Sequence, residues 1–281
     1  MMEIKSNKPK VSVVMITYGH EKYIKDAIEG VLSQDCNFDF ELILSNDASP
    51  DKTDYIINEI LNEHPLAHKI KYTLHEKNIG MMPNSIYSLN QCKGEYIAFC
   101  EGDDYWTEDA KLQTQVDFLD NNPSYIMTFH AVDIVFANST DFYEYPLPTK
   151  DTLNLQDIIR NHYIPTCSLV YRASRFKLGY PYWLIKSISG DIPVEILLAS
   201  QGLAKYFDKQ MACYRRNEGG ISLSPIQIDK MRDGYIFMYR KLLLEIGIYK
   251  GYYLIYIISR LFAGKLKINI INILNKFNVF R

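Results

Sequence analysis

The chain has 281 residues, of which 47% are apolar and 23% are charged, so it can build one large α/β domain or one domain with an appendage. Its net charge of −2 argues against nucleic acid as a partner, because binding to phosphates needs a basic surface. The five cysteines lack paired metal spacing and indicate the reduced core thiols of a cytoplasmic protein. We expect neither a signal peptide nor a membrane-spanning helix, since no apolar run reaches ~18 residues.

The first part of the chain alternates strands with helices. In the first helix, Ile24, Ala27, Ile28, Val31 and Leu32 recur at the spacing of one helix face. Such alternation predicts βαβ units with right-handed crossovers, and hence an α/β fold with a mostly parallel sheet. The predicted strands are 11–17, 40–45, 70–75 and 96–100, and the predicted helices are 23–34, 51–62 and 111–121.

A polar, proline-punctuated loop at 138–150 follows an extended apolar segment at 125–136. We interpret this loop as a seam between a nucleotide-binding half at 1–137 and an acceptor-binding half at 138–224, with a helical extension at 225–281. The elements predicted after the seam are a helix at 155–161, a strand at 166–171, a helix at 192–200, a strand pair at 204–214 and a loop at 215–224.

The most informative motif is KGEYIAFCEGDDYW, where a short apolar strand ends in a group of acids. Glu101, Asp103 and Asp104 follow the strand at its carboxyl end, where open α/β sheets bind ligands. Adjacent carboxylates repel one another unless a cation neutralises them, and Mg²⁺ or Mn²⁺ with substrate phosphates suits such oxygen ligands. The motif therefore predicts a metal-diphosphate site. The alternative is a solvated acidic turn that caps the helix starting near Thr107.

The C-terminal stretch from Ile246 onward has no Asp or Glu, while basic residues interrupt a field of Ile, Leu, Tyr and Phe. Two interpretations remain open. The segment is either a basic amphipathic helix on an anionic membrane surface, or a helix docked on the protein with a basic outer face. The basic residues are Lys250, Arg260, Lys265, Lys267, Lys276 and Arg281.

Several motifs occur together and in order. They are VSVVMITY, VLSQ, FELILSNDAS, KNIG, GEYIAFCEGDDYW and KLQTQVDFL. In this order the chain resembles family 2 glycosyltransferases, which are GT-A-fold enzymes that use nucleotide-diphospho-sugars. The resemblance covers about 9–135, and PTCSLVYR, SGDIPVEILLASQG and YRRNEGGIS continue it to about residue 222. It implies a Rossmann-like, mostly parallel central sheet flanked by helices, with a helical C-terminal extension.

The resemblance implies roles for residues at the strand ends. Thr17 and Tyr18 would bind the nucleotide, with the Tyr18 ring stacked on the base. Asp47 would accept hydrogen bonds from the base or ribose, unless it serves only as a cap or Asx-turn residue. Asp103 matches the carboxylate that faces the ribose, and Asp104 matches the ligand of Mn²⁺ or Mg²⁺ that bridges to the diphosphate.

In the acceptor-binding half, Asp191 occupies the place of the family's catalytic base. In an inverting reaction it would remove the proton from the acceptor hydroxyl as that oxygen attacks the anomeric carbon. The alternative is that Asp191 caps the helix that begins at Ile192. Arg215 and Arg216 precede a glycine pair, and a basic loop there is a candidate for closing over the diphosphate.

Two departures from the family pattern stand out. Gly190 replaces the acidic neighbour of the base, and Asn217 stands where many relatives carry a His near the metal. The chain also lacks the Gln-x-x-Arg-Trp motif that marks processive synthases, which favours a single transfer.

The resemblance implies an inverting, non-processive hexosyltransferase that moves one sugar from a nucleotide-sugar, most often a UDP-sugar. The acceptor would be a glycan or a lipid-linked glycan of a surface polysaccharide such as a lipopolysaccharide or capsule, with the enzyme in the cytoplasm or on the inner membrane face. One alternative is a nucleotidyltransferase that makes activated sugars, although Tyr18-Gly19-His20 lacks the glycine-rich basic loop that a triphosphate needs. The other is a nucleotide-sugar-binding protein without transferase activity.

Overall fold

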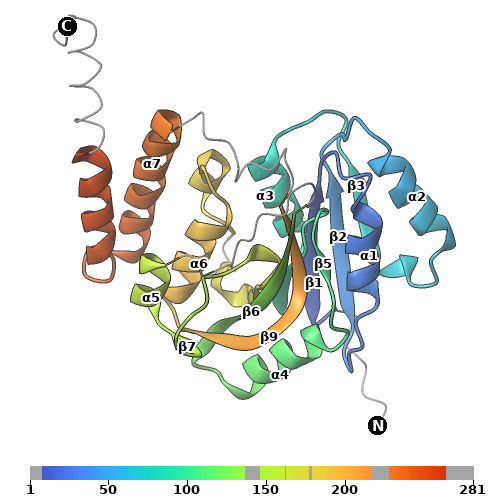
Figure 1. Ribbon diagram of the computed structural model, residues 1–281, viewed down its shortest axis with the longest axis horizontal. Coiled ribbons are helices and arrows are strands. Elements are labelled where there is room, and N and C mark those ends of the chain that lie inside the picture. Colours follow the sequence, from blue (N-terminus) through green and yellow to red (C-terminus); the bar gives the residue numbers. More distant parts are fainter. Residues whose placement is uncertain (1–7, 137–145, 162, 177–178, 217–227, 264–281) are drawn as a thin grey trace, which may run out of the picture.

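A nine-stranded sheet forms the centre of the molecule, and helices cover both of its faces (Figure 1). The computed structural model describes residues 8–136, 146–161, 163–176, 179–216 and 228–263. Helices α1 and α2 lie on one side of the sheet, and α5, α6 and α7 lie on the other. This arrangement is the α/β architecture that the sequence predicts.

The sheet has strand order β3-β2-β1-β4-β8-β6-β9-β5, and β7 pairs with β9. The strands β3, β2, β1 and β4 run parallel to one another, while β8 is antiparallel to both β4 and β6. The strands β6 and β9 also run parallel to each other, so the sheet is mixed, with one parallel part formed by β3, β2, β1 and β4 and a second formed by β6 and β9. The strands are β1 Val11–Thr17, β2 Phe40–Asn46, β3 Ile70–Leu74, β4 Tyr96–Phe99, β5 Tyr105–Trp106, β6 Tyr125–Phe136, β7 Thr152–Leu153, β8 Val170–Arg172 and β9 Leu203–Arg216.

Seven α-helices, α1 to α7, and a further helix at 252–263 flank the sheet in the described part of the chain. Helix α5 begins with a capping box, in which the Asn154 side chain accepts from the backbone of Asp157 and the Asp157 side chain accepts from the backbone of Asn154. The helices are α1 Ile24–Leu32, α2 Thr53–Glu63, α3 Met81–Gln91, α4 Lys111–Asn121, α5 Leu155–Arg160, α6 Asp191–Ala199 and α7 Ile228–Ile246. Short 3₁₀ turns lie at Ala67–Lys69, Thr166–Ser168, Ala173–Phe176 and Tyr182–Lys186.

Alternation along β1 divides the core into two clusters. Val13 and Met15 point to the face covered by α1, whereas Val14 and Ile16 point to the opposite face. Because successive strand residues face opposite sides, a strand covered by helices on both sides is apolar throughout. This is why β1 reads as an uninterrupted apolar run.

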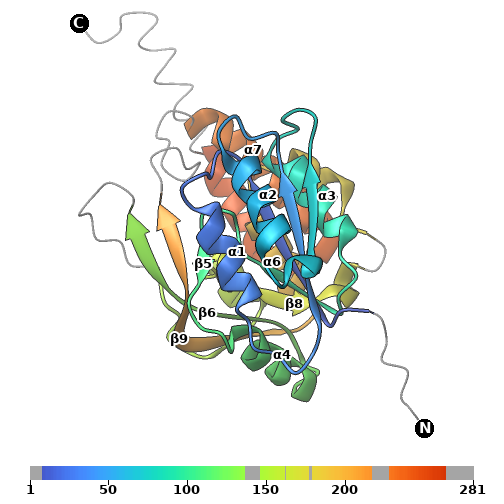
Figure 2. The ribbon, with the colours of Figure 1, turned by 90° about the vertical axis from the view of Figure 1, so that its right-hand side faces the viewer.

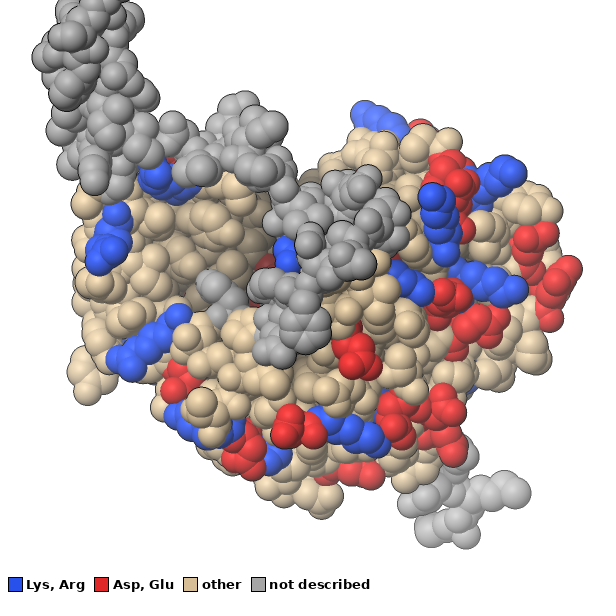
Figure 3. Space-filling view, in the orientation of Figure 1, with Lys and Arg blue, Asp and Glu red and all other residues tan. Residues whose placement is uncertain are grey.

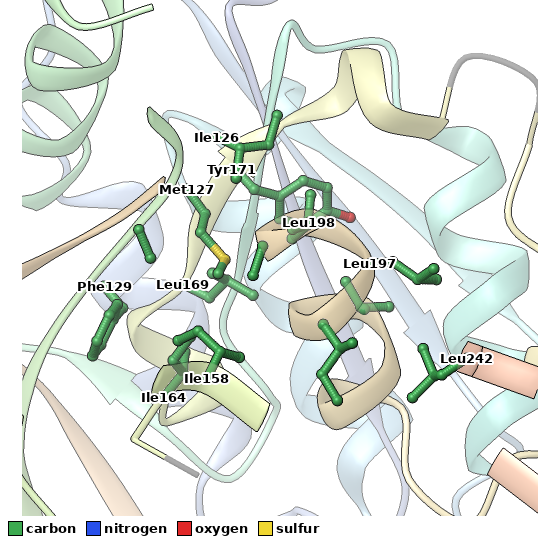
Figure 4. Close-up of a cluster of buried hydrophobic side chains, with 14 of the residues drawn as sticks. Ile126, Met127, Phe129, Ile158, Ile164, Leu169, Tyr171, Leu197, Leu198 and Leu242 are labelled. Atoms are coloured by element: carbon green, nitrogen blue, oxygen red, sulfur yellow. The ribbon is translucent and has the colours of Figure 1, made fainter. Parts of the chain in front are cut away.

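The second cluster joins α5, α6 and α7 to the back of the sheet (Figure 4). Met127 and Phe129 of β6 and Tyr171 of β8 meet Leu197 of α6 and Leu242 of α7 in it. Packing of this kind fixes the position of α6 relative to the strands, and α6 carries one of the predicted site residues.

Three local predictions differ from the structure. Helix α3 was not predicted, because its sequence MMPNSIYSLNQ is polar and contains a proline in the first turn. The segment 204–214 is one long strand, β9, and not a strand pair. Asp208 and Lys209 look like a turn, but a register shift between His130/Phe207 and Ala131/Gln210 absorbs them as a bulge while β9 follows β6 (Figure 2). The predicted strand at 166–171 begins as a 3₁₀ turn.

Some of the predictions lie outside the described residues. They include 138–145 of the predicted seam, 217–224 of the basic loop with Asn217, and 225–227 and 264–281 of the extension. Among the helices that the structure does describe, none has the length and apolar character needed to cross a lipid bilayer.

Candidate functional site

The topology brings the carboxyl ends of β1, β2 and β4 to one edge of the sheet. The backbone N–H of Asp47 donates to the carbonyl of Thr17 at 3.0 Å, and that of Gly102 donates to Ile16 at 3.0 Å. Three predicted segments that are far apart in the sequence therefore meet here. Figure 3 shows the surface hollowed between this part of the molecule and the part that carries α6 and α7.

The end of β1 offers an exposed ring above a tightly packed turn. Tyr18 is 49% exposed, while Thr17 is buried and its Oγ1 lies 3.1 Å from Nδ1 of His20. Gly102 is packed against this turn so closely that a Cβ there would lie 2.7 Å from Thr17 Oγ1 and 2.9 Å from His20 Nδ1. His20 Nε2 in turn lies 3.9 Å from a carboxylate oxygen of Asp103. His20 was not predicted as a site residue, and its only signal in the sequence was its place in the turn after the first strand.

Asp47 is buried, and both of its carboxylate oxygens accept hydrogen bonds from the backbone. Ile79 donates to Oδ1 at 2.7 Å and Gly80 donates to Oδ2 at 2.9 Å. Gly80 adopts a φ of +92° and precedes helix α3. Asp47 therefore anchors the loop before α3, and since a carboxylate has about four lone-pair positions, it retains acceptor capacity toward a ligand.

Asp104 is 2% exposed, and it is held from two sides. Its Oδ1 accepts from the backbone N–H of Arg215 at 2.8 Å, and its side chain also hydrogen-bonds the Cys167 thiol. Burial, followed by the charges of Asp103 and Glu101, raises the pKa of the Asp104 carboxyl well above its ordinary value. A cation bound at this position would offset both the cost of burying the Asp104 charge and its repulsion from Asp103 and Glu101.

Glu101 is a second acid near Asp104, and it is half-buried with its Oε2 atom fully buried. Its Oε2 has no hydrogen-bond partner within the described residues. Burial, with smaller contributions from the charges of Asp103 and Asp191, raises the pKa of Glu101 to about 8. Glu101 was predicted to be a supporting or structural acid without a catalytic role, yet its charge and those of Asp104 and Asp191 influence one another.

The donor set at this edge fits Mg²⁺ or Mn²⁺ only in part. Within the described residues, no group of three or more His, Cys, Asp or Glu side chains is arranged to hold a metal ion. Mg²⁺, however, commonly binds one or two carboxylates and completes its coordination with substrate phosphates and water. Asp104, with the orphaned Oε2 of Glu101 nearby, offers such a minimal set.

Asp191 is the first residue of α6, across from the acids at the end of β4. Its Oδ1 accepts from the Ser189 hydroxyl and from the backbone N–H of Ile192, so the side chain does bond the first turn of the helix. Its Oδ2 makes no hydrogen bond within the described residues, and the residue is half-buried. Its charge is the smallest of the causes that raise the pKa of Glu101, which indicates that the two acids lie in the same region of the molecule. Asp191 therefore contacts the start of the helix through Oδ1, while Oδ2 has no hydrogen bond within the described residues.

Gly190, the departure beside Asp191, packs on helix α3. A Cβ at this position would lie 3.1 Å from the sulfur of Met82. An acidic side chain could enter here only if Met82 moved.

Arg215 is not free to reach a ligand. Its guanidinium donates to Asp26 at 2.6 Å and to the backbone carbonyl of Asp103 at 3.2 Å, and it lies 4.2 Å from the Tyr105 ring centroid. The guanidinium thus ties β9 to α1 and to the acidic motif. The Arg216 guanidinium lies 5.9 Å from the Phe136 ring centroid. Both residues end β9, and the rest of the predicted loop lies outside the described part of the chain.

A further acid, Glu195, lies one helical turn after Asp191 on α6 and is buried. The sequence analysis did not single it out. The available signal was a charged residue within the otherwise apolar run IPVEILLA, at a spacing of four from Asp191.

Comparison with known proteins gives matches over most of the chain. The family model described as Glycosyl transferase family 2 matches residues 12–177. An uncharacterized protein of Mycobacterium tuberculosis is 33% identical over 216 residues, which are 75% of this chain and 60% of that protein. The minor teichoic acid biosynthesis protein GgaB of Bacillus subtilis is 34% identical over 137 residues, 48% of this chain and 15% of that protein. The chain thus spans less than two thirds of the length of each of these relatives.

Solved structures with the same fold include two with bound nucleotide-sugars. S. aureus TarS 1-349 in complex with UDP-GlcNAc superposes with a TM-score of 0.65 and 21% identity, over 83% of this chain and 66% of that one. The mannosyltransferase PcManGT from Pyrobaculum calidifontis, in complex with GDP-Man and Mn²⁺, superposes with a TM-score of 0.60 and 13% identity, over 85% of this chain and 65% of that one.

Proposed function

The chain belongs to glycosyl transferase family 2, and from this membership we propose that it transfers one sugar, with inversion, from a nucleotide-diphospho-sugar to a hydroxyl group of a glycan or lipid-linked acceptor. The observation that carries the proposal is that the buried Asp104, the half-buried Glu101 and the partly free carboxylate of Asp191 influence one another electrostatically. Asp104 and Glu101 can hold a leaving diphosphate through a cation, and Asp191 can accept a proton.

On the donor side, the exposed ring of Tyr18 stacks on the base and Asp103 faces the ribose. Asp47 contributes through its remaining acceptor capacity, and Thr17 supports the turn that presents Tyr18. A UDP-sugar is the first donor to test, because the similar structure of TarS contains UDP-GlcNAc.

The proposed cofactor is Mn²⁺ or Mg²⁺, held by Asp104 with Glu101 beside it. When bound, the ion supplies positive charge that stabilises the leaving diphosphate. The Mn²⁺ in the similar PcManGT structure and the unfavourable burial of the two acids both support this assignment.

On the acceptor side, Asp191 acts as the general base. Its free Oδ2 takes the proton from the acceptor hydroxyl while that oxygen forms a bond to the anomeric carbon and the bond to the diphosphate breaks. Attack from the face opposite the leaving group inverts the anomeric configuration. The Ser189 hydroxyl and the Ile192 N–H, both bound to Oδ1, hold the carboxylate in one orientation.

The acceptor is proposed to belong to a surface polysaccharide of the teichoic or teichuronic acid type, since two Bacillus subtilis relatives carry such names. The test is a screen of UDP-sugars for sugar-nucleotide hydrolysis and transfer, with and without Mn²⁺. Wild-type turnover that requires the metal and is lost in Asp104→Asn supports the proposal. Nucleotide binding without turnover across all acceptors would instead favour a binding protein.

We further propose that the segment 244–262 rests on an anionic membrane surface. Leu254 is buried against the core, so the helix at 252–263 is docked on the protein, yet its outer face and the preceding turn are apolar rather than basic. Tyr249 is 96% exposed, and no acid occurs from Ile246 onward, where Lys250 and Arg260 add positive charge. The other exposed apolar residues are Leu244, Ile248, Tyr252, Ile255, Tyr256 and Phe262.

Liposome flotation of the full chain tests this placement. Replacement of Ile248 and Tyr249 by Ser should reduce flotation with vesicles that contain phosphatidylglycerol, whereas the distant exposed Tyr55→Ser variant should float like the wild type. Equal flotation of all three proteins would exclude this surface as the contact.

A further inference from the structure

His20 lies in the turn after β1, and its two ring nitrogens face different groups. Nδ1 lies 3.1 Å from the hydroxyl oxygen of Thr17, whereas Nε2 lies 3.9 Å from a carboxylate oxygen of Asp103. The second distance is longer than a hydrogen bond, and Nε2 makes no hydrogen bond within the described residues. The side chain of His20 is 21% exposed and that of Asp103 is 26% exposed, so a ligand can reach both groups from solvent.

The backbone around His20 fixes the position of its ring. The His20 N–H donates to the hydroxyl oxygen of Thr53 at 2.9 Å, and the His20 carbonyl accepts from the N–H of Ile24 at 2.9 Å. Gly102 brings the acidic motif against the ring, since a Cβ at this position would lie only 2.9 Å from Nδ1. The turn and the acidic motif therefore hold the His20 ring beside Asp103 in the protein without a ligand.

The ring nitrogen that faces Asp103 carries a proton. A carboxylate repels a bare nitrogen lone pair and attracts an N–H group. In the neutral ring, Nδ1 then accepts a hydrogen bond from the Thr17 hydroxyl, and in the charged ring Nδ1 donates to it, so the 3.1 Å contact suits both states. In both states Nε2 is a hydrogen-bond donor next to the acceptor oxygen of Asp103.

A donor and an acceptor at this separation suit one hydroxyl group of a ligand. An oxygen about 2.8 Å from each of two atoms 3.9 Å apart forms an angle of about 90° with them, which allows one hydroxyl to accept from Nε2 and donate to Asp103. Because a carboxylate has about four lone-pair positions, Asp103 can accept this bond in addition to its other contacts. An unprotonated phosphate oxygen suits only the His20 side of the pair.

We propose that His20, oriented by Thr17, binds a ribose hydroxyl group of the donor together with Asp103 and so determines specificity for ribonucleotides. Tyr18 lies in the same turn and is 49% exposed, so a base stacked on its ring brings the attached ribose toward His20. A deoxy nucleotide leaves the two polar groups unpaired, and the site therefore rejects it. The inference rests on the proposed function, since it takes Tyr18 and Asp103 as nucleotide-binding residues.

The test measures nucleotide affinity by calorimetry with Mn²⁺ present throughout. The nucleotide among UDP, GDP and ADP that binds most tightly is compared with its 2′-deoxy and 3′-deoxy analogues. In the wild type, at least one analogue should bind about 10-fold or more weakly than the parent nucleotide. His20→Asn keeps a polar atom near the Nδ1 position but lacks Nε2, so this discrimination should fall at least about 5-fold.

Two further variants serve as controls. His20→Gln keeps an amide nitrogen near the Nε2 position, and its discrimination should stay within about 3-fold of the wild type. His64→Asn is the matched control, because His64 Nε2 lies 3.5 Å from the Glu29 carboxylate at the end of α2, outside the site. It should bind all three nucleotides like the wild type.

A role limited to bracing the turn gives a different result. His20→Asn would then weaken the parent nucleotide and its analogues by the same factor, which would overturn the inference while the proposed function stands. Equal binding of all three nucleotides by the wild type would also overturn it. If His20→Asn does not fold, Thr17→Val takes its place, because it removes the hydroxyl that orients the ring: reduced discrimination supports the inference, and unaltered discrimination overturns it. Absence of binding to UDP, GDP and ADP would overturn the proposed function, and the inference with it.

Discussion

The carboxylate of Asp104 accepts a hydrogen bond from the backbone N–H of Arg215, 2.8 Å away, although 111 positions separate the two residues in the sequence. The bond joins the end of β4 to the end of β9. Asp104, the acid that we propose as the metal ligand, is thereby positioned by a strand from the second half of the chain.

Replacement of Asp104 by Asn should abolish metal-dependent turnover. The variant keeps the hydrogen bond from Arg215 through its amide oxygen but loses the charge that attracts the cation. We expect turnover to fall by at least about 100-fold, with stability unchanged or higher because a buried charge is removed. Coupled detection of released UDP measures the effect, and the exposed Asp109→Asn is the matched control. Full activity of Asp104→Asn would rule out its role as a metal ligand.

Asp191→Asn should separate donor binding from catalysis. Because the amide cannot take a proton from the acceptor, turnover should fall by about 10²- to 10⁴-fold. UDP affinity, measured by calorimetry, should stay within about 2-fold, since Asp191 lies on the acceptor side. The helix start is preserved, as the amide oxygen still accepts from Ile192. Unchanged turnover would reduce Asp191 to a helix cap.

The main effect of Arg215→Ala should be a loss of stability. The guanidinium has an ion pair with Asp26 and a contact with the Tyr105 ring, and loss of both should lower the free energy of unfolding by about 1–2 kcal/mol. Urea denaturation checks this value, with Lys209→Ala, which breaks an exposed pair with Glu108, as the control of little effect. Weaker UDP binding at unchanged stability would show instead that Arg215 reaches the diphosphate.

Lys111→Met should make the protein more stable near neutral pH. The ammonium group is fully buried 4.0 Å from the Trp106 ring centroid, and burial lowers its pKa from 10.5 to about 7. Between pH 7 and 10.5 the Lys111 side chain binds a proton in the unfolded chain but not in the folded chain. Lys111 therefore makes the free energy of unfolding rise with pH in this range, and below pH 7 it causes no change of that free energy with pH. Met keeps the apolar stem but leaves Oε1 of Gln115 without its donor, so we expect a net gain of about 2 kcal/mol at pH 7.

Urea midpoints at pH 7, 8.5 and 10 test the effect of Lys111. The gain of Lys111→Met over the wild type should shrink as the pH rises toward 10, whereas Lys25→Met, at an exposed position, should show no pH-dependent difference. A constant difference across this range would mean that Lys111 is charged in the folded protein.

Much of the fold could be predicted from local patterns. The first strand was placed at its observed bounds, and the helix that follows it was placed to within two residues, because their apolar spacing is regular. Helix α3 was missed because its polar sequence gives a weak periodic signal. The single bent β9 was missed because Asp208 and Lys209 resemble a turn, and only pairing with β6 keeps the chain extended there.

By itself, the sequence determined the α/β class, the family resemblance and the identity of the acids, because these depend on residue type and local spacing. The tertiary structure decided the environment of each acid. It buried Oε2 of Glu101 without a partner among the described residues, bound Asp104 to Arg215 and left Oδ2 of Asp191 without a hydrogen bond in the same part of the chain. Burial and long-range contacts set the protonation and orientation of a carboxyl group, and these depend on segments far apart in the chain, which no local pattern encodes.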